Sequence, residues 1–319
     1  MVDKEILQYK VGGLMYMPAF QKNIVGKLSG NKLPYLNSAA FCLEDSISDE
    51  SVDEAEATLK IILRELESVE NLPLIFVRIR SPRHLQIFHE TIGMHSKILT
   101  GYILPKVDMN NAFAYINVAK EINEGRLSNP IYIMPTFESK RIAILLTRQT
   151  ELLSLKQAFD EIKQIILNIR VGANDLCNLY GLRRNINQTI YDIGVVRDIF
   201  VDIINVFATD YVVAGSVWNY FGGDNDNAWA EGLRRELELD KANGFTGKTA
   251  IHPSQLPIIF NSMKVTKTDW DDANMLLDWK SSTHGVTKSA DGSRMNEVKC
   301  HSAWARKIKI LGELYGVIE

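Results

Sequence analysis

The stretch RVGANDLCNLYG (170–181) begins as an apolar strand and then becomes polar. Asn174 and Asp175 stand where the apolar run ends. An acid at the end of a buried strand is unfavourable unless something there uses its charge. The stretch therefore predicts a buried strand that delivers a carboxylate to a binding site.

Similar short apolar runs recur along the chain, separated by longer segments with helical periodicity. None alternates apolar and polar residues at its centre, which is typical of strands covered on both faces. The eight runs are GLMYMPA (13–19), AAFCLED (39–45), LIFVRIR (74–80), GYILPKVD (101–108), IYIMPTFES (131–139), NIRVGANDL (168–176), DYVVAGSVW (210–218) and GKTAIHP (247–253). Eight strands alternating with helices predict an α/β fold, a (β/α)₈ TIM barrel. The alternative is a doubly wound open sheet, which usually has fewer strands.

Two of the intervening segments show how the helices are expected to begin and end. In the segment 51–68, Ser51 can cap the helix and Glu54 can complete a capping box. The segment 228–244 ends in Asn-Gly, which is a common helix stop. One face of the first helix is predicted to be buried, and it carries Ala55, Leu59, Ile62, Leu63 and Leu66.

The chain continues beyond the eighth strand with an extension of its own. We expect a barrel domain over 1–264 and a helical extension or lid over 265–319, with Thr268 capping its first helix, turns over 281–293 and a last helix over 294–315. The two helices carry Trp270, Trp279, Trp304 and Leu311, and such apolar side chains need to be buried. This predicts a homo-oligomer in which the extension packs on a neighbouring barrel. The alternative is an extension folded onto its own barrel.

Composition excludes several classes of partner. The 319 residues are 46% hydrophobic and carry a formal net charge of −3, so no electrostatic footprint for nucleic acid is present. The three cysteines are widely spaced, which is typical of a protein from a reducing compartment. No secretory signal and no apolar run of about 18 residues is seen. We therefore expect a soluble cytoplasmic protein without membrane or nucleic-acid partners.

Charged residues gather where the predicted strands end, which is where TIM barrels place their catalytic groups. Acids and bases occur together, which favours a site for an anionic substrate with a metal ion. The residues are Glu44, Asp45, Arg78, Arg80, Lys106, Asp108, Glu138, Asp175, Lys248 and His252.

Glu138 and Asp175 follow adjacent predicted strands, so their carboxylates should converge. Oxygen ligands of this kind suit Mg²⁺, which shares its coordination shell with water and substrate. The alternative role for Asp175 is to cap the helix that follows.

The segment GFTGKT (244–249) looks like the end of a phosphate-binding loop, but the first glycine is missing and a strand follows. A P-loop is therefore not predicted.

Taken in order, the motifs MPA, CLEDSI, VRIR, ILPKVD, PTFES, GANDL and GFTGKTAIHPSQ span about 14–255. This series resembles the HpcH/HpaI aldolase and citrate lyase β-subunit family, most closely its CitE-like branch. The resemblance implies a TIM barrel that assembles as a trimer or hexamer. It also implies that Glu138 and Asp175 bind Mg²⁺ and that Arg78 holds a substrate carboxylate. Glu44 and Asp45 match the acidic pair near the metal waters, and Lys106 matches a lysine of the same site.

The sequence also departs from the family pattern. The first strand lacks the family's arginine, PTFES replaces an Ile-Glu-Thr/Ser core, and Arg80 stands where an asparagine is common. These changes fall where a CoA or acyl-carrier thioester binds, so a CoA thioester is the less favoured substrate.

These observations predict a Mg²⁺-dependent carbon–carbon lyase or aldolase acting on a small carboxylate, either a 2-oxo acid or an acyl thioester. Asp45 or Glu44 is the expected base. Two alternatives stay open: thioester hydrolysis in the same site, and a non-catalytic binding or scaffold protein on the same fold.

Overall fold

The computed structural model describes residues 3–20, 23–29, 32–126, 128–223, 227–280 and 285–319. Its contacts divide the chain into two compact units, Met1–Ile259 and Phe260–Glu319.

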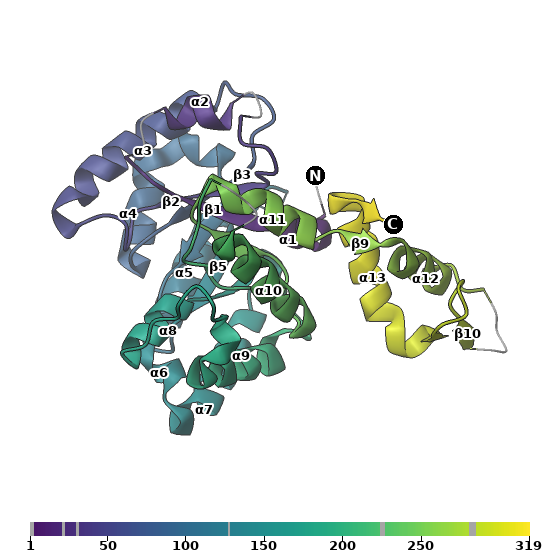
Figure 1. The fold of residues 1–319 in the computed structure, drawn as a ribbon. Helices are drawn as coiled ribbons and strands as arrows, with labels where there is room; N and C mark the ends of the chain where they lie inside the picture. The colour runs from purple at the N-terminus through teal and green to yellow at the C-terminus, as the bar shows by residue number, and fades with distance from the viewer. Residues whose placement is uncertain (1–2, 21–22, 30–31, 127, 224–226, 281–284) are drawn as a thin grey trace. The chain divides into compact units, whose positions relative to one another are not determined.

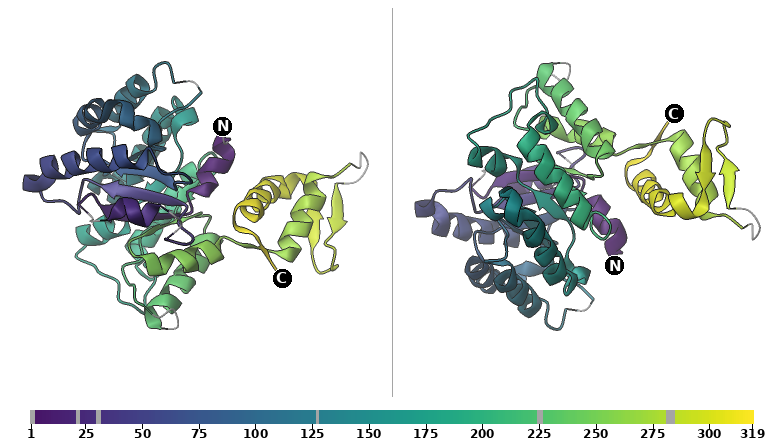
Figure 2. Two further views of the ribbon diagram at one scale, coloured as in Figure 1. Left: turned by 90° about the horizontal axis from the view of Figure 1, so that it is seen from above. Right: turned by 90° about the horizontal axis from the view of Figure 1, so that it is seen from below.

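The first unit is a closed barrel of eight parallel strands (Figures 1 and 2). The strand order is β7-β6-β5-β4-β3-β2-β1-β8. A parallel bridge between Gly215 and Lys248 joins the two ends, and the Gly215 amide donates to the Gly247 carbonyl at 3.0 Å. The predicted TIM barrel is therefore confirmed, and the open sheet is wrong. The strands are β1 (Gly13–Pro18), β2 (Ser38–Cys42), β3 (Leu74–Arg78), β4 (Gly101–Leu104), β5 (Tyr132–Phe137), β6 (Ile169–Val171), β7 (Val213–Ala214) and β8 (Lys248–Ala250).

Helices surround these strands (Figure 2). The α-helices that begin in this unit are α1 (Lys4–Lys10), α2 (Ile24–Leu28), α3 (Val52–Leu66), α4 (Pro82–Ile92), α5 (Ala112–Ile122), α6 (Lys140–Ala143), α7 (Leu145–Asp160), α8 (Ala173–Leu179), α9 (Gly194–Phe207), α10 (Ala228–Ala242) and α11 (Leu256–Ser262). Short 3₁₀ helices are η1 (Asp49–Ser51), η2 (Gly93–Ile98), η3 (Lys163–Ile165), η4 (Ile190–Asp192) and η5 (Pro253–Gln255).

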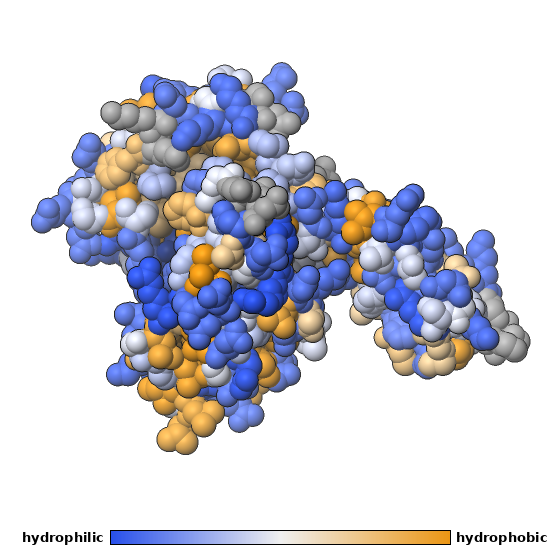
Figure 3. All heavy atoms as spheres, in the orientation of Figure 1, coloured by the Kyte–Doolittle hydropathy of each residue, from blue (hydrophilic) through white to orange (hydrophobic). Residues whose placement is uncertain are grey.

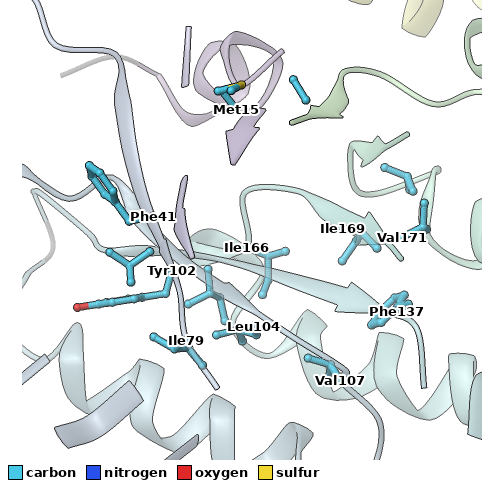
Figure 4. Packing of buried hydrophobic residues seen from close by; sticks show 14 of the residues in the cluster. Met15, Phe41, Ile79, Tyr102, Leu104, Val107, Phe137, Ile166, Ile169 and Val171 are labelled. Carbon is cyan, nitrogen blue, oxygen red and sulfur yellow. The ribbon is translucent and has the colours of Figure 1, made fainter. Parts of the chain in front are cut away.

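The apolar core has two parts, because successive side chains of a strand point to opposite sides. The larger part lies between strands and helices and includes Phe41, Leu104 and Phe137 (Figure 4). The smaller part joins Leu14, Ala40, Phe76, Ile103 and Met134 of the strands to Leu7 and Val11. These last two belong to α1 and its C-cap, so apolar side chains fill the barrel at the end where the strands begin. Polar chemistry is left to the opposite end.

Helix α3 buries the predicted face: Ala55, Leu59, Ile62, Leu63 and Leu66 are its buried residues. The predicted capping box at its start is wrong. Ser51 ends the turn η1 with ψ near 6°, its side chain makes no capping bond, and its hydroxyl instead accepts from the Ser48 hydroxyl at 3.1 Å. Helix α10 ends as predicted, since Asn243 is its C-cap and Gly244 has φ +92°.

The second unit contains two helices, α12 (Lys267–Leu277) and α13 (Val298–Tyr315), which pack on each other. The cap of α12 is Thr266 rather than Thr268, since the Thr266 hydroxyl accepts from the Asp269 amide at 3.1 Å. The last helix starts later than predicted because β11 (Met295–Glu297) pairs with β10 (Val286–Lys288) in an antiparallel hairpin. β12 (Val317–Ile318) pairs in parallel with β9 (Val265–Thr266). Residues 281–284 of the predicted turn region lie outside the described residues.

In the part of the chain that the structure describes, no helix is both long enough and apolar enough to span a membrane.

Candidate active site

A cavity of about 420 Å³ lies at the end of the barrel where the strands finish. Its walls come from strands far apart in the sequence, including Tyr16, Arg78, Glu138 and Arg170. Asp45 and Asp175 also line it. Glu44 and Lys106 do not line the cavity, but they form ion pairs with residues that do. We call the six predicted site residues the mouth cluster: Glu44, Asp45, Arg78, Lys106, Glu138 and Asp175.

Glu138 and Asp175 reach the cavity from neighbouring parts of the barrel. Glu138 directly follows β5, and its side chain is only 3% exposed. Asp175 lies in the first turn of α8, so the strand ends before it, at Val171. The cap position of α8 is occupied by Gly172, so the alternative role of Asp175 as the helix cap is wrong.

Arg78, the last residue of β3, lies among three carboxylates. Its Nη2 is 2.8 Å from Glu44 Oε2, 3.2 Å from Asp45 Oδ2 and 3.2 Å from Glu138 Oε1. Burial acts to lower the pKa of Arg78, but Tyr16, Glu138, Glu44 and Cys42 outweigh it and raise the pKa, so the guanidinium remains charged. Each of these contacts uses the same nitrogen.

Lys106 links the same acids from the other side. Its backbone amide donates to Glu138 Oε1 at 3.0 Å, and its Nζ donates to Glu44 Oε1 at 2.5 Å and to Asp45 Oδ1 at 2.8 Å. Lys106 has φ +49°, in the left-handed region that non-glycine residues rarely adopt. Such strain persists where surrounding contacts hold it, often at functional sites.

The acids of the cluster have different proton affinities. Burial raises the pKa of Glu138 to about 7, with Asp175 and Glu44 adding to the rise and Arg78 opposing it. Burial also raises the pKa of Glu44. Burial acts in the same sense on Asp45, but hydrogen bonds with Lys106 and Glu44 outweigh it and lower the Asp45 pKa. Asp45 is thus held as a carboxylate, with its side chain half exposed.

The mouth cluster is not electrically balanced. When all its groups are ionised, four carboxylates surround two cations and leave an excess of two negative charges. No group of three or more His, Cys, Asp or Glu side chains forms a closed metal site among the described residues. Mg²⁺ needs no such cage, because one or two carboxylates with water and substrate oxygens suffice. The donor chemistry and the excess charge therefore fit a divalent cation.

Gly172 allows Glu138 to take its position. A Cβ atom on Gly172 would lie 1.7 Å from Glu138 Oε2 and 2.6 Å from its Cβ. The φ of Gly172 is −103°, which any residue can adopt, so the glycine is needed for space rather than for conformation. The GANDL motif thus contributes both a carboxylate and the room for another.

Similarity to known proteins agrees with this geometry. Residues 5–317 match the family described as C–C bond lyases of the TIM-barrel fold. The chain belongs to this C–C bond lyase family. The predicted kinship with citrate lyase-like enzymes is confirmed at this level. No curated protein sequence is significantly similar to the chain.

Solved structures similar to this C–C bond lyase family member include citrate lyase-like proteins. A citrate lyase from Burkholderia xenovorans is 13% identical, with a TM-score of 0.72, 96% of this chain and 93% of that chain covered. CitE from Mycobacterium tuberculosis, in complex with magnesium, acetoacetate and coenzyme A, is 17% identical, with a TM-score of 0.60, covering 95% and 99%. RipC from Yersinia pestis is 15% identical, with a TM-score of 0.53, covering 80% and 95%. At these identities the likeness is one of fold.

Four other charged strand-end residues do not join the site of this lyase-family barrel. Arg80 bonds to the Leu43 carbonyl and Asp49, and Asp108 accepts from the Asn110 amide in the next turn. His252 caps η5 and stacks on a phenylalanine ring. Lys248 points to α10 and is fully buried there between two acids. Its place in GFTGKT therefore reflects structure, not phosphate binding.

Sequence reasoning missed several residues that line the cavity of this lyase-family member, notably Arg170, Thr136 and Tyr16. A signal for Arg170 existed, since it is the charged residue inside an apolar strand, as Arg78 is. Thr136 and Tyr16 carry no comparable signal, because hydroxyl-bearing residues are common in strands.

Proposed function

We propose that this member of the C–C bond lyase family is a Mg²⁺-dependent lyase or aldolase that acts on a small carboxylate substrate. The observation that carries the proposal is the excess of two negative charges in the mouth cluster, beside a cavity of about 420 Å³. Glu138 and Asp175 would hold the ion. When bound, Mg²⁺ would polarise a substrate carbonyl and so favour enolate chemistry at the neighbouring carbon.

The remaining residues supply binding and proton transfer. Arg78 contacts the protein carboxylates through Nη2, and these contacts leave its Nη1 unused. We assign Nη1 to a carboxylate of the substrate, with the planar guanidinium fixing its orientation. Asp45 is ionised and half exposed, so we assign it as the base that takes a proton from the substrate.

Lys106 is a positioning residue in this proposal. Asp45 and Glu44 raise its pKa against the effect of burial, so it is a cation at neutral pH and cannot itself act as the base. Its charge holds the neighbouring acids Glu44 and Asp45 together, because Nζ donates to both carboxylates.

The finer features of the substrate and the assembly are also proposals. A 2-oxo acid is favoured over a CoA thioester because the chain departs from the family pattern in the first strand, in PTFES and at Arg80, where the family resemblance puts the thioester. We further propose a cytoplasmic homo-oligomer, trimer or hexamer, in which 265–319 acts as a lid on a neighbouring mouth. Leu145 and Leu146 are 73% and 92% exposed at the start of α7, and Figure 3 shows hydrophobic residues gathered at that end of the barrel. Sedimentation as a monomer would remove this assembly.

The metal assignment is tested by titrating Mg²⁺ calorimetrically into the metal-free protein. The Glu138→Gln/Asp175→Asn double variant should show no saturable binding, since it lacks both charged ligands. Glu161→Gln/Asp198→Asn is the matched control, because it removes the same two charges from exposed sites. The parent and the control should bind equally. Parent-like binding in the double variant contradicts the assignment.

The reaction is tested by incubating the parent with small 4-hydroxy-2-oxo acids, with 3-hydroxy dicarboxylic acids and with CoA thioesters of 3-hydroxy acids, and trapping carbonyl products. Mg²⁺-dependent release of a 2-oxo acid from a free acid supports the lyase. Release of CoA alone supports the thioesterase alternative. Ligand binding without product from any compound supports a binding protein on the same fold.

A further inference from the structure

The cavity contains a second arginine that the mouth cluster does not use. Arg170 is the middle residue of β6 and is only 2% exposed, yet it lines the cavity. Its neighbours Ile169 and Val171 belong to the outer core between strands and helices (Figure 4). Side chains alternate along a strand, so Arg170 points into the barrel.

Arg170 has no carboxylate within ion-pair distance among the described residues. Its Nη2 donates to Thr249 Oγ1 at 2.7 Å, and the hydroxyl of Tyr16 is a second neutral partner. Its Nη1 is buried and has no hydrogen-bond partner. Arg78, by contrast, contacts three carboxylates through one nitrogen. Of the two arginines that line this cavity, Arg78 is therefore paired with carboxylates and Arg170 is not.

A buried cation without an anion is unfavourable, because desolvation is not offset by an opposite charge. Burial lowers the pKa of Arg170, but arginine side chains remain protonated in proteins, so the charge persists. Folds keep such an unfavourable group mainly at functional sites, where a ligand completes it.

The strand register gives the depth of Arg170 relative to the proposed metal ligand Glu138. Thr136 pairs with Arg170 across β5 and β6, so Glu138 stands opposite Gly172, two residues further toward the mouth. Two residues of strand correspond to about 7 Å. Thr136 Oγ1 is also buried without a partner and lines the same cavity. The floor of the cavity thus offers a cation and an unpaired hydroxyl roughly one layer below the proposed metal ligands.

We propose that Arg170 binds a second carboxylate of the substrate, so that the substrate is a short-chain dicarboxylic acid spanning from Arg78 to Arg170. The proposal rests on the proposed function for the end near the mouth. What it adds to that function is a deep subsite, formed by Arg170, Tyr16, Thr136 and Thr249. A monocarboxylic acid would leave this cation buried and unpaired, and would therefore be discriminated against.

The test measures binding of matched acids by calorimetry in Mg²⁺. The probes are freshly prepared oxaloacetate against 2-oxobutyrate, and 2-oxoglutarate against 2-oxopentanoate. Within each pair only the distal carboxylate is replaced by a methyl group. The parent should bind at least one dicarboxylate over tenfold more tightly than its partner. Arg170→Met should weaken binding of that dicarboxylate over 30-fold, and binding of the monocarboxylate less than threefold. Equal losses for both, or no preference in the parent, overturn the proposal.

Two further measurements separate a binding role from a structural one. The thermal midpoint of ligand-free Arg170→Met should equal or exceed that of the parent, because an unpaired buried charge is removed; a clear decrease assigns Arg170 to structure. Arg170→Lys keeps the positive charge but lacks the planar guanidinium that can hold a carboxylate with two hydrogen bonds. Its affinity for the dicarboxylate should fall over tenfold, while its affinity for the monocarboxylate should not change. Parent-like affinity in Arg170→Lys overturns the proposal.

The two proposals can fail separately. If the Glu138/Asp175 variant binds Mg²⁺ like the parent while Arg170→Met loses only dicarboxylates, the metal assignment fails and the deep subsite stands. If Mg²⁺ binding is lost as expected but the Arg170 variants keep their preference, only the deep subsite fails.

Discussion

The barrel contains two clusters of charged side chains, and they differ in balance. Beside β8, Arg184, Glu236, Asp240 and Lys248 form what we call the neutral cluster, in which two cations meet two acids. Lys248 Nζ lies 2.9 Å from Glu236 Oε1 and 2.6 Å from Asp240 Oδ2, and Arg184 also pairs with Glu236. All four side chains are at most 4% exposed. The mouth cluster combines two cations with four acids and faces a cavity.

The difference shows how charged residues that stabilise the fold can be told from charged residues that bind a ligand. The acids of the neutral cluster also accept hydrogen bonds from the Ile190 amide and the Tyr191 hydroxyl, both at 2.7 Å. Nothing there requires an added ion. In the mouth cluster the acids exceed the cations, and one carboxyl has a pKa near neutrality. A matched set of buried charges indicates structure, and an unmatched set beside a cavity indicates a ligand.

The comparison is tested most severely by breaking the neutral cluster. Lys248→Met leaves two buried acids without their common cation, and the loss of one partner from a buried pair typically destabilises by about 3–5 kcal/mol. We expect a decrease of that size in the free energy of unfolding, measured in urea, with Mg²⁺ affinity of the folded variant unchanged.

The control is Lys120→Met, which removes a half-exposed lysine paired with Glu161 at 3.1 Å. An exposed pair of this kind contributes about 1 kcal/mol or less. A loss for Lys248→Met no larger than for this control would mean that the neutral cluster is not structural.

Sequence reasoning predicted the barrel well because its signal repeats. Eight apolar runs with helical segments between them leave few other folds, even though β7 has only two paired residues. The six residues of the mouth cluster were also singled out from the sequence, since each ends a strand, follows one or lies in the first helical turn after one. The site therefore depends on a position that a linear sequence reveals.

The direction in which a side chain points was harder to predict. Lys248 and Thr249 are neighbours, yet Lys248 reaches outward to α10 and Thr249 bonds to Arg170 inside the barrel. In a strand as short as β8, both faces carry polar residues, so periodicity gives no direction. The β10–β11 hairpin was missed for a related reason, since four of its six paired residues are polar and only Asn296 is buried.

The second prediction concerns the effect of pH on the mouth cluster. The pKa of Glu138 is raised from its usual 4.5 to about 7 in the folded protein, so the folded state holds this proton more tightly than the unfolded state. The metal-free parent should therefore lose stability as the pH rises from about 4.5 to about 7, by roughly 3 kcal/mol at most from this group. Glu138→Gln should remove this loss.

The measurement is urea unfolding of both proteins in a chelator between pH 4 and pH 8. As the pH rises across this range, Glu138→Gln should become progressively more stable relative to the parent. Adding Mg²⁺ at pH 8 should restore stability to the parent but not to the variant. Glu161→Gln serves as an exposed control. A difference that does not vary with pH would show that Glu138 keeps an ordinary pKa, and the contrast between the clusters would weaken.

The smallest expected effect comes from a glycine that touches the mouth cluster without carrying charge. In Gly172→Ala the new Cβ would meet both the carboxylate and the Cβ of Glu138, so the neighbouring backbone has to move. Overpacking of this kind costs about 1–3 kcal/mol. Because Glu138 is displaced, Mg²⁺ affinity should also fall, by about 10–100-fold as for other disturbed metal-site neighbours.

A double-mutant cycle assigns this effect to the contact itself. In a Glu138→Gly background the opposing side chain is absent, so Gly172→Ala should cost nearly nothing there. Gly26→Ala is the control, because a Cβ at Gly26 meets nothing within 4 Å. An undiminished cost in the Glu138→Gly background would place the strain elsewhere. Gly172 would then be required by the turn into α8, and the precise seating of Glu138 would have to come from Lys106 and Arg78 alone.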